Sequence, residues 1–328
     1  MKAAIMVPGP KGGSWDVRDV ERPVIGPGQV LARVHASSIN RAEFRRLHTL
    51  RLETGKPVPE ARTGGGDAAG EVVEVGPGVT GIKAGDRIMG RCAGGFAEFA
   101  LLDAREVMPA PALLSWEAAA SVPVVFVVVH DGLFVSGQLH KGETLLVTAV
   151  PSGVGTAALV LGKFLGARVI GTSRSPEKLE RLKAHGLDVA VVTGVDGMGE
   201  AVTAASGPAG VDMVVDNIGA DALAPCIDVL NVGGRFCTIG RMSGVHTAEM
   251  NIDKLAEKRL HLYGVSNRLR NAAQRAESAK RFMADLFPAL SDGRLKPIVD
   301  CAFPLDDIVA AQAYVEADRH VGKVVVTM

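Results

Sequence analysis

The chain has 328 residues, of which 47% are hydrophobic, and this is enough material for two packed domains. Its 36 basic and 36 acidic side chains cancel, which argues against nucleic acid or an anionic membrane as the main partner. The four cysteines form no CxxC pair, so we expect no disulfide framework and a cytoplasmic location. The sequence contains no signal-peptide pattern at its start and no apolar run of the roughly 18 residues that cross a membrane.

Residues 1–115 predict a β-rich domain. Short β-like pieces alternate there with Gly/Pro turns, and no amphipathic pattern of helix length stands out. We therefore expect a partly closed β-barrel. The pieces are KAAIMV, QVLARVHAS, GEVVEVG, DRIMG and GFAEFALL.

Residues 143–266 predict an α/β domain that is preceded by a helix over 115–136. Helix-length segments, among them a charged helix over 176–185, separate runs of β-branched residues. Such runs are typical of strands buried on both faces, which predicts a doubly wound parallel sheet. The six runs are 143–150, 167–173, 189–194, 213–219, 234–240 and 260–266.

The C-terminal segment has no core of its own. It predicts helices over 272–290 and 305–318, a short extended piece between them, and an edge strand, GKVVVTM, at the end. We expect this segment to fold back onto the β-rich domain. The predicted organisation is therefore a β-rich domain (1–120), a doubly wound α/β domain (121–266) and a returning segment (267–328).

The Gly-rich loop PSGVG, between the first of the six strands and the next helix, is the predicted phosphate site. Glycines let the backbone approach a pyrophosphate, and a helix N-terminus supplies free N–H groups. The full GxGxxG pattern is absent, so a tight turn that binds nothing is the alternative. The predicted cofactor residues here are Ser152, Gly153, Val154 and Gly155.

The end of the following strand favours NADP over NAD. An acidic residue at this position would bind the ribose hydroxyls of NAD, but the strand ends in Ser173 and Arg174. Ser173 offers a hydroxyl donor, while Arg174 and Lys178 offer positive charge, and this set suits a 2′-phosphate. The alternative for Arg174 is an ordinary solvated charge.

Short motifs follow one another along the whole chain: SSIN, GGGDAAGEVVEVGPGV, GDRIMG, GGFAEFALL, VFVVVHDGLF, SGVG, VDNIG, GGRFCTIG and VGKVVV. Together they resemble the medium-chain dehydrogenase/reductase superfamily and, within it, the zinc-independent quinone oxidoreductases. The resemblance implies a Rossmann sheet combined with a GroES-like β-rich catalytic domain.

The chain departs from the family pattern at several positions. Ser152 replaces the first glycine of a GGVG loop, residues 128–130 read Val-Val-His in place of Thr-Ala-Tyr, and residues 40–43 read Asn-Arg-Ala-Glu in place of Asn-Pro-x-Asp. A tyrosine usual in the following loop is missing. These departures leave the acceptor open.

Zinc is not expected. Zinc-dependent relatives use a Cys near the end of SSIN and a His-Glu pair in the next Gly-rich turn, where this chain has Asn40, Gly66 and Asp67. The closely spaced cysteines of a structural zinc site are also absent. Without a Lewis acid, reduction of an electrophilic acceptor is favoured over oxidation of an alcohol.

The resemblance implies that Asn40 lies beside the nicotinamide, where it binds a ribose hydroxyl, water or the substrate oxygen; an Asn that closes a turn is the alternative. It also implies that Val128 packs near the nicotinamide. His130 either donates into the cleft or is a satisfied core histidine.

Other candidates follow strand ends, where ligands of such sheets bind. Asn217 and Gly240 are predicted cofactor residues, with a plain turn glycine as the alternative for Gly240. The resemblance implies that the backbone of 263–266, including Val265 and Ser266, meets the carboxamide. The predicted substrate-pocket residues are Phe44, His48 and Met242.

The sequence thus predicts an NADPH-dependent reductase of a small electrophilic acceptor, either a quinone or the activated C=C bond of an α,β-unsaturated carbonyl. An enoyl-thioester reductase of a biosynthetic pathway and an NADPH-binding protein without turnover are the alternatives. The apolar strand over 260–266 predicts a homodimer joined by the edges of two Rossmann sheets, unless a helix or loop of the same chain covers that edge.

Overall fold

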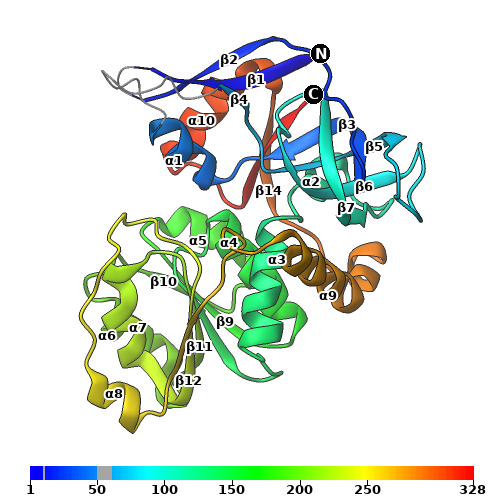
Figure 1. The fold of residues 1–328 in the computed structure, drawn as a ribbon. Helices are drawn as coiled ribbons and strands as arrows, with labels where there is room; N and C mark the ends of the chain where they lie inside the picture. Colours follow the sequence, from blue (N-terminus) through cyan, green and yellow to red (C-terminus); the bar gives the residue numbers. More distant parts are fainter. Residues whose placement is uncertain (10–11, 50–60) are drawn as a thin grey trace. The chain divides into compact units, whose positions relative to one another are not determined.

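The structure is a computed structural model that describes residues 1–9, 12–49 and 61–328. These residues form two compact units, which are coloured along the sequence in Figure 1. One unit is Met1–Val124 together with Asn271–Met328, and the other is Val125–Arg270. In the ranges that the structure describes, every helix is too short or too polar to cross a bilayer.

The second unit contains the predicted parallel sheet. Its strand order is β10-β9-β8-β11-β12-β13, and all neighbours are parallel. Numbered along the sheet's own chain order this is 3-2-1-4-5-6, the doubly wound Rossmann order, and it confirms the predicted sheet. The strands are β8 (Thr144–Val147), β9 (Arg168–Ser173), β10 (Val189–Val192), β11 (Val211–Asp216), β12 (Leu230–Thr238) and β13 (His261–Gly264).

Helices cover both faces of this sheet, and the strand side chains between them are fully buried, as at Leu146, Ile170 and Val214. Serine caps fix two helix starts, because Ser152 Oγ accepts from Gly155 N–H and Ser175 Oγ accepts from Lys178 N–H. The helices are α4 (Gly153–Phe164), α5 (Pro176–Lys183), α6 (Met198–Ser206), α7 (Leu223–Val229) and α8 (Ile252–Glu257).

The prediction of a single helix over 115–136 is wrong. The chain instead forms α2 (Trp116–Ala120), α3 (Val125–His130) and a π-helical turn (Asp131–Ser136). Pro123 lies in the break, where it lacks an N–H group and disfavours helical backbone at the residue before it. The break coincides with the division between the two units.

The first unit contains a three-stranded sheet, β2-β1-β4, and a six-stranded sheet, β14-β15-β3-β5-β6-β7. An additional pairing of β3 with β7 closes four strands into a ring, as expected for a partly closed barrel. The strands are β1 (Lys2–Val7), β2 (Ser14–Asp19), β3 (Gln29–Ser38), β4 (Arg62–Thr63), β5 (Asp67–Val75), β6 (Arg87–Ala93), β7 (Phe99–Pro109), β14 (Val299–Pro304) and β15 (Lys323–Thr327).

Two expectations for this unit are wrong. The last strand, β15, is not an edge strand, because it lies between β14 and β3 and buries Val324, Val325 and Val326. A short helix, α1 (Arg41–Thr49), forms where none was expected. Its buried Phe44 and Leu47 are three residues apart, but the charged residues around them conceal this spacing in the sequence.

The C-terminal segment returns to the first unit, where red β15 lies beside blue β3 in Figure 1. Its long helix α9 (Ala272–Ser291) is held to β7 by a buried carboxylate, Glu106, which accepts from Arg275 Nε at 2.7 Å and from Arg91 Nε at 3.2 Å. A second helix, α10 (Ile308–Glu316), packs against β14 and β15. The segment thus shares the core of the β-rich unit.

Candidate functional site

The candidate residues fall into two groups, one in each unit. In Val125–Arg270, the group lies at the carboxyl ends of β8 and β11, the two strands at which the order of the sheet reverses. Thr148 Oγ1 donates to Asp216 Oδ1 at 2.8 Å and accepts from Asn217 N–H at 2.8 Å. This reversal is where ligands of doubly wound sheets bind.

Asn217 is locked in place by these strand ends. Its Nδ2 donates to the Thr148 carbonyl oxygen at 2.8 Å, and its Oδ1 is buried without a hydrogen-bond partner among the described residues. Asp216 accepts from the N–H groups of Ile218 and Gly219, and burial raises the pKa of its carboxyl. A buried acceptor without a partner is costly, so Asn217 Oδ1 fits a donor supplied by a ligand.

Two glycines near this group, one in the Gly-rich loop and one after β12, leave no room for a side chain. A Cβ atom at Gly155 would lie 2.6 Å from Val150 O, and one at Gly240 would lie 2.4 Å from Asn217 O. Gly155 N–H donates to Ser152 Oγ, so Ser152 uses one of the N–H groups of the helix start. The remaining N–H groups of the first turn of α4 are the predicted phosphate donors.

The predicted 2′-phosphate residues meet at the carboxyl end of β9. Ser173 ends this strand and its Oγ accepts from Ser175 N–H at 3.1 Å, while Arg174 and Lys178 follow in the turn and the first turn of α5. Glu177 lies in the same turn and accepts from Ser175 Oγ–H. The end of β9 itself carries no carboxylate.

The remaining candidates of this unit differ in exposure. His130 is 1% exposed and lies against the Phe134 ring at 4.8 Å, which fits a core histidine. Val128 is partly exposed, and Ser266 is exposed beyond β13. Val265 N–H donates to Thr238 O, and Met242 N–H donates to Asn217 O. These bonds hold the backbone of Val265 and of Met242 next to the ends of β12 and β11.

The second group lies in the β-rich unit around Asn40, between β3 and α1. Asn40 Nδ2 donates to Asp67 Oδ2 at 3.0 Å and to Ser38 O at 3.3 Å. Lys323 Nζ donates to Asn40 Oδ1 at 2.9 Å and to Ile39 O at 2.8 Å. The Asn40 amide is therefore held at both ends, by a carboxylate on one side and an ammonium on the other.

The charged side chains of the Asn40 group are buried, and they include more carboxyl groups than ammonium groups. Asp67, Lys323 and Glu43 are all less than 5% exposed. Burial together with the charge of Asp67 raises the pKa of Glu43 to about 8, against the hydrogen bond from Asn40 N–H and the charge of Lys323. Burial raises the pKa of Asp67 and lowers that of Lys323, while their mutual attraction opposes both shifts.

Sequence reasoning missed Lys323, Thr148 and Asp216 as site residues. A lone lysine inside the apolar run VGKVVV was the available signal for Lys323. The predicted pocket residue Phe44 is buried in a core cluster with Ile39, and the exposed His48 pairs with Glu316 Oε1 at 3.0 Å. These contacts do not bring Phe44 or His48 to the Asn40 amide.

Zinc does not fit the Asn40 group. Gly66 has no side chain, and the Asp67 carboxylate already accepts from Ser38 N–H, Ser38 Oγ–H and Asn40 Nδ2. Among the described residues, no three His, Cys, Asp or Glu side chains are placed to hold a metal ion.

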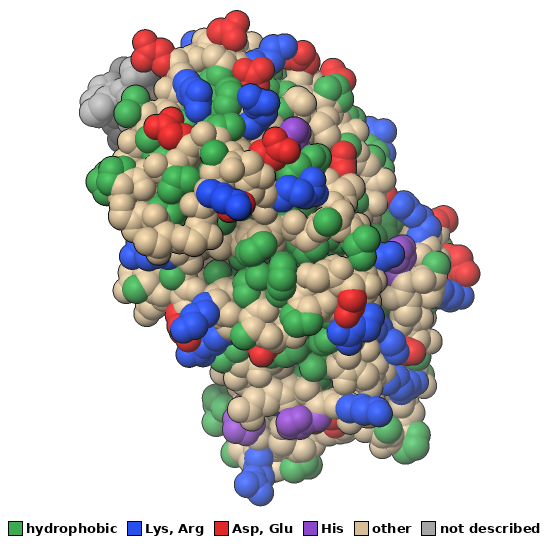
Figure 2. All heavy atoms as spheres, turned by 90° about the vertical axis from the view of Figure 1, so that its right-hand side faces the viewer, with side chains coloured by type: hydrophobic (Ala, Val, Ile, Leu, Met, Phe, Trp, Pro, Cys, Tyr) green, Lys and Arg blue, Asp and Glu red, His purple; other side chains and the backbone are tan. Residues whose placement is uncertain are grey.

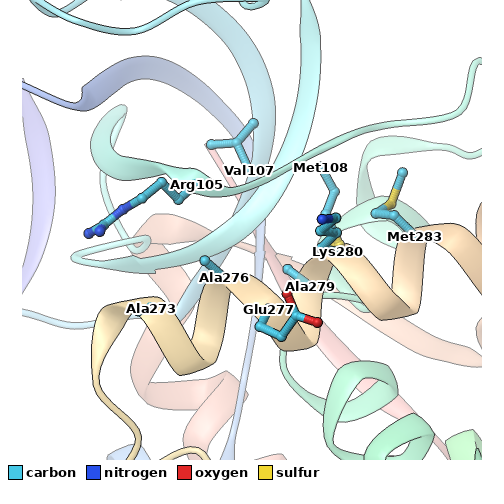
Figure 3. A pocket seen from close by; sticks show the side chains of 9 residues that line it. All are labelled: Arg105, Val107, Met108, Ala273, Ala276, Glu277, Ala279, Lys280 and Met283. Carbon is cyan, nitrogen blue, oxygen red and sulfur yellow. The ribbon is translucent and has the colours of Figure 1, made fainter.

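Two hollows lie away from both groups. One, of about 480 Å³, lies between β7 and α9, where Met108 and Val107 of the strand approach Ala276 and Ala279 of the helix (Figure 3). The other, of about 330 Å³, lies at the amino ends of the parallel strands, opposite the Gly-rich loop. On the face drawn in Figure 2, charged side chains of both signs are interspersed.

Comparisons with known proteins match both units. A family model described as alcohol dehydrogenase GroES-like domain matches residues 26–112, and one described as zinc-binding dehydrogenase matches residues 186–326. Quinone oxidoreductase of Rattus norvegicus is 28% identical over 93% of this chain and 90% of its own length. Acryloyl-coenzyme A reductase of Metallosphaera sedula is 27% identical over 99% of each.

Larger proteins contain a similar segment. Polyketide synthase GfsB of Streptomyces halstedii is 34% identical over 80% of this chain, which spans only 4% of the length of GfsB. Among solved structures, a mycobacterial quinone oxidoreductase is 27% identical, and a mycobacterial protein complexed with NADPH is 26% identical. Both cover 100% of each chain with a TM-score of 0.86.

Proposed function

Because this chain belongs to the medium-chain dehydrogenase/reductase superfamily of oxidoreductases, we propose that it is an NADPH-dependent reductase of quinones or of activated C=C bonds in α,β-unsaturated carbonyl compounds. The observation that carries this proposal is the Asn40 group. It offers an amide, an ammonium and a carboxyl group whose pKa is raised to about 8, and among the described residues no ligand set for a metal is found. Such donors suit an acceptor that is already electrophilic.

The residues at the sheet edge fit a dinucleotide. Ser152–Gly155 offer N–H groups to the pyrophosphate, and Asn217 Oδ1 offers an acceptor to a hydroxyl or amide donor of the cofactor. Ser173, Arg174 and Lys178 offer donors to a 2′-phosphate. When bound, NADPH supplies the hydride; the chain supplies binding and polarisation.

Asn40 contributes hydrogen bonding to the acceptor oxygen. Its shorter bond, to Asp67 Oδ2 at 3.0 Å, fixes the amide plane. Its longer bond, to Ser38 O at 3.3 Å, is the one that a substrate oxygen would replace. Lys323 on Asn40 Oδ1 polarises the amide, so its N–H becomes a better donor as negative charge develops on the acceptor.

An enoyl-thioester reductase is the second candidate, and the similarity to acryloyl-coenzyme A reductase and to a polyketide synthase favours it. The chemistry is the same, because a thioester carbonyl activates the neighbouring C=C bond for hydride addition. The two candidates differ in whether a bulky carrier is needed for binding.

The test is a panel of a simple quinone, a small enone and an enoyl-coenzyme A, each mixed with protein and NADPH while NADPH absorbance is followed. We expect steady NADPH consumption with at least one of them. Preference for the coenzyme A ester would favour the second candidate. NADPH binding without consumption by any acceptor, or faster turnover of alcohols with NADP, would contradict the proposed function.

A further inference from the structure

Thr148, Asp216 and Asn217 form a polar cluster between the carboxyl ends of the buried strands β8 and β11. All three residues are at most 1% exposed. In the part of the chain that the structure describes, no Lys or Arg stabilises the charge of Asp216. Its carboxyl oxygens accept instead from three donors, namely Thr148 Oγ–H, Ile218 N–H and Gly219 N–H. Burial of a carboxylate without a cation costs free energy, so stability alone does not explain this cluster.

The Thr148 hydroxyl connects two segments of the sheet edge. It donates to Asp216 Oδ1 and accepts from Asn217 N–H, both at 2.8 Å. Burial raises the pKa of the Asp216 carboxyl, and the hydrogen bond from Thr148 is the largest influence that opposes this shift. Thr148 also begins the connection from β8 to Ser152, the cap of α4. The hydroxyl therefore ties the predicted phosphate loop to the end of β11.

The turn at 217–219, which this carboxylate holds, itself holds the residues that follow β12. Met242 N–H donates to Asn217 O at 3.1 Å, and Ser243 N–H donates to Ile218 O at 2.9 Å. One hydrogen-bonded network thus connects three segments of the sheet edge: the loop before α4, the turn after β11 and the loop after β12.

The amino ends of the same two strands offer a comparison. Asp212 Oδ2 accepts there from the Thr144 backbone N–H at 2.8 Å, and Asp212 is half-buried. A threonine and an aspartate therefore occur at both ends of β8 and β11. The three connected segments lie at the carboxyl ends, where the strand order reverses and ligands of doubly wound sheets bind.

We propose that Thr148 and Asp216 are positioning residues for the dinucleotide cofactor. Both are fully buried, so they act through the three segments that they hold in place. This inference rests on the proposed function, because it requires NADPH at this edge of the sheet. Their loss should weaken cofactor binding more than it slows the reduction, since the proposed donor to the acceptor, Asn40, belongs to the other unit.

The first test is Thr148→Val, which keeps the shape of the side chain and removes the hydroxyl. We expect the NADPH dissociation constant, measured by fluorescence titration, to rise about tenfold or more, the scale of one hydrogen bond to a charged group. KM for NADPH should rise with it, while kcat at saturating NADPH should stay within a few-fold. Thr148→Ser keeps the hydroxyl and should restore most of the lost affinity, which a role in apolar packing alone would not give.

The amino ends of the strands supply the matched controls. Thr144→Val makes the same substitution at the other end of β8, and Asp212→Asn is the counterpart of Asp216→Asn on β11. Asp216→Asn should weaken NADPH binding at least as much as Thr148→Val, because one carboxyl oxygen becomes an NH₂ group that faces a donor. Both controls should keep NADPH affinity near the wild-type value.

Thermal melts of the same variants separate positioning from stability. A merely structural role predicts that NADPH affinity follows the melting temperature at either end of the strands. Positioning predicts a loss of affinity at the carboxyl ends alone, whatever the melting temperatures of the two controls. If Asp216→Asn does not fold, the comparison of Thr148→Val with Thr148→Ser and Thr144→Val still decides.

Two results would overturn the inference: wild-type NADPH affinity in Thr148→Val, or equal losses of affinity in Thr148→Val and Thr144→Val. A wild type that binds neither NADPH nor NADH would overturn the proposed function and this inference with it. A wild type that binds NADPH but reduces no acceptor would overturn the proposed reductase function alone, because the affinity measurements would still decide the roles of Thr148 and Asp216.

Discussion

Asn40 illustrates what the sequence can and cannot locate at the scale of a residue. Its position as the last residue of SSIN identifies it as a site candidate, but its partner Lys323 is 283 residues away. Local patterns carry no information on such a contact, and a lysine in an apolar strand does not reveal what balances its charge. The same holds for Glu43, because its pKa is raised first by burial and then by the charge of Asp67, and both depend on the folded structure.

The role of Asn40 can be tested by Asn40→Ala. The variant removes the amide that we propose as the donor to the acceptor oxygen, so kcat should fall by about 10²-fold, the scale of a lost oxyanion donor. NADPH affinity should remain within a few-fold in fluorescence titrations. If the main effect is weaker NADPH binding, Asn40 is a cofactor ligand and its proposed role is wrong.

We predict that the preference of the protein for NADPH over NADH depends on Arg174. The wild type should bind NADPH at least ~10-fold more tightly than NADH, which corresponds to ~1.4 kcal/mol. Arg174→Ala should narrow this ratio, because it removes a charge at the end of β9. The control is Lys183→Ala, in the last turn of α5, where Lys183 pairs with Glu180. Equal binding of the two cofactors by the wild type would contradict the prediction.

At the scale of elements, the six strands of the parallel sheet were predictable because strands buried on both faces are nearly continuous apolar runs. The interrupted helix after residue 115 was not, since Val124–Val129 continues the apolar run beyond Pro123. The interior position of β15 in its sheet could not be predicted from the sequence either. An apolar strand looks the same at an edge or in the middle, and only its pairing with β14 and β3 decides.

The contact between the ends of β11 and β12 predicts a strict need for Gly240. A Cβ atom there would meet the Asn217 backbone at 2.4–2.8 Å, so Gly240→Ala should displace Asn217. We expect a loss of about 1–3 kcal/mol in the free energy of unfolding and weaker NADPH binding. Thermal melts and fluorescence titrations measure the two effects.

Gly194→Ala is the matched control for this substitution, because a Cβ atom at Gly194 meets nothing within 4 Å and its φ angle is not positive. It should leave both stability and NADPH affinity near the wild-type values. Normal NADPH binding by Gly240→Ala would show that the strand ends do not hold the cofactor.

At the scale of the whole molecule, the sequence predicts the architecture of both units, the β-rich one and the doubly wound α/β one. Short β pieces separated by turns and strands separated by helices give different spacings of apolar residues along the chain. It does not predict the acceptor, which depends on how loop side chains shape a pocket.

The oligomeric state depends on a surface, namely the outer edge of β13. In the described chain β13 is the last strand of its sheet, and Leu262 and Tyr263 are half-buried.

We predict that two copies of β13 pair across a twofold axis, because an unpaired apolar strand is prone to associate. Light scattering should then report about 68 kDa, twice the 34.2 kDa of one chain. Val265 N–H points inward to Thr238 O, so by the alternation of a strand Leu262 N–H points outward. Leu262→Pro removes this donor and should give monomers, while His261→Ala keeps the backbone donors and should stay dimeric. A wild-type mass of one chain at micromolar concentration would reject the dimer and favour an edge that is covered within the chain.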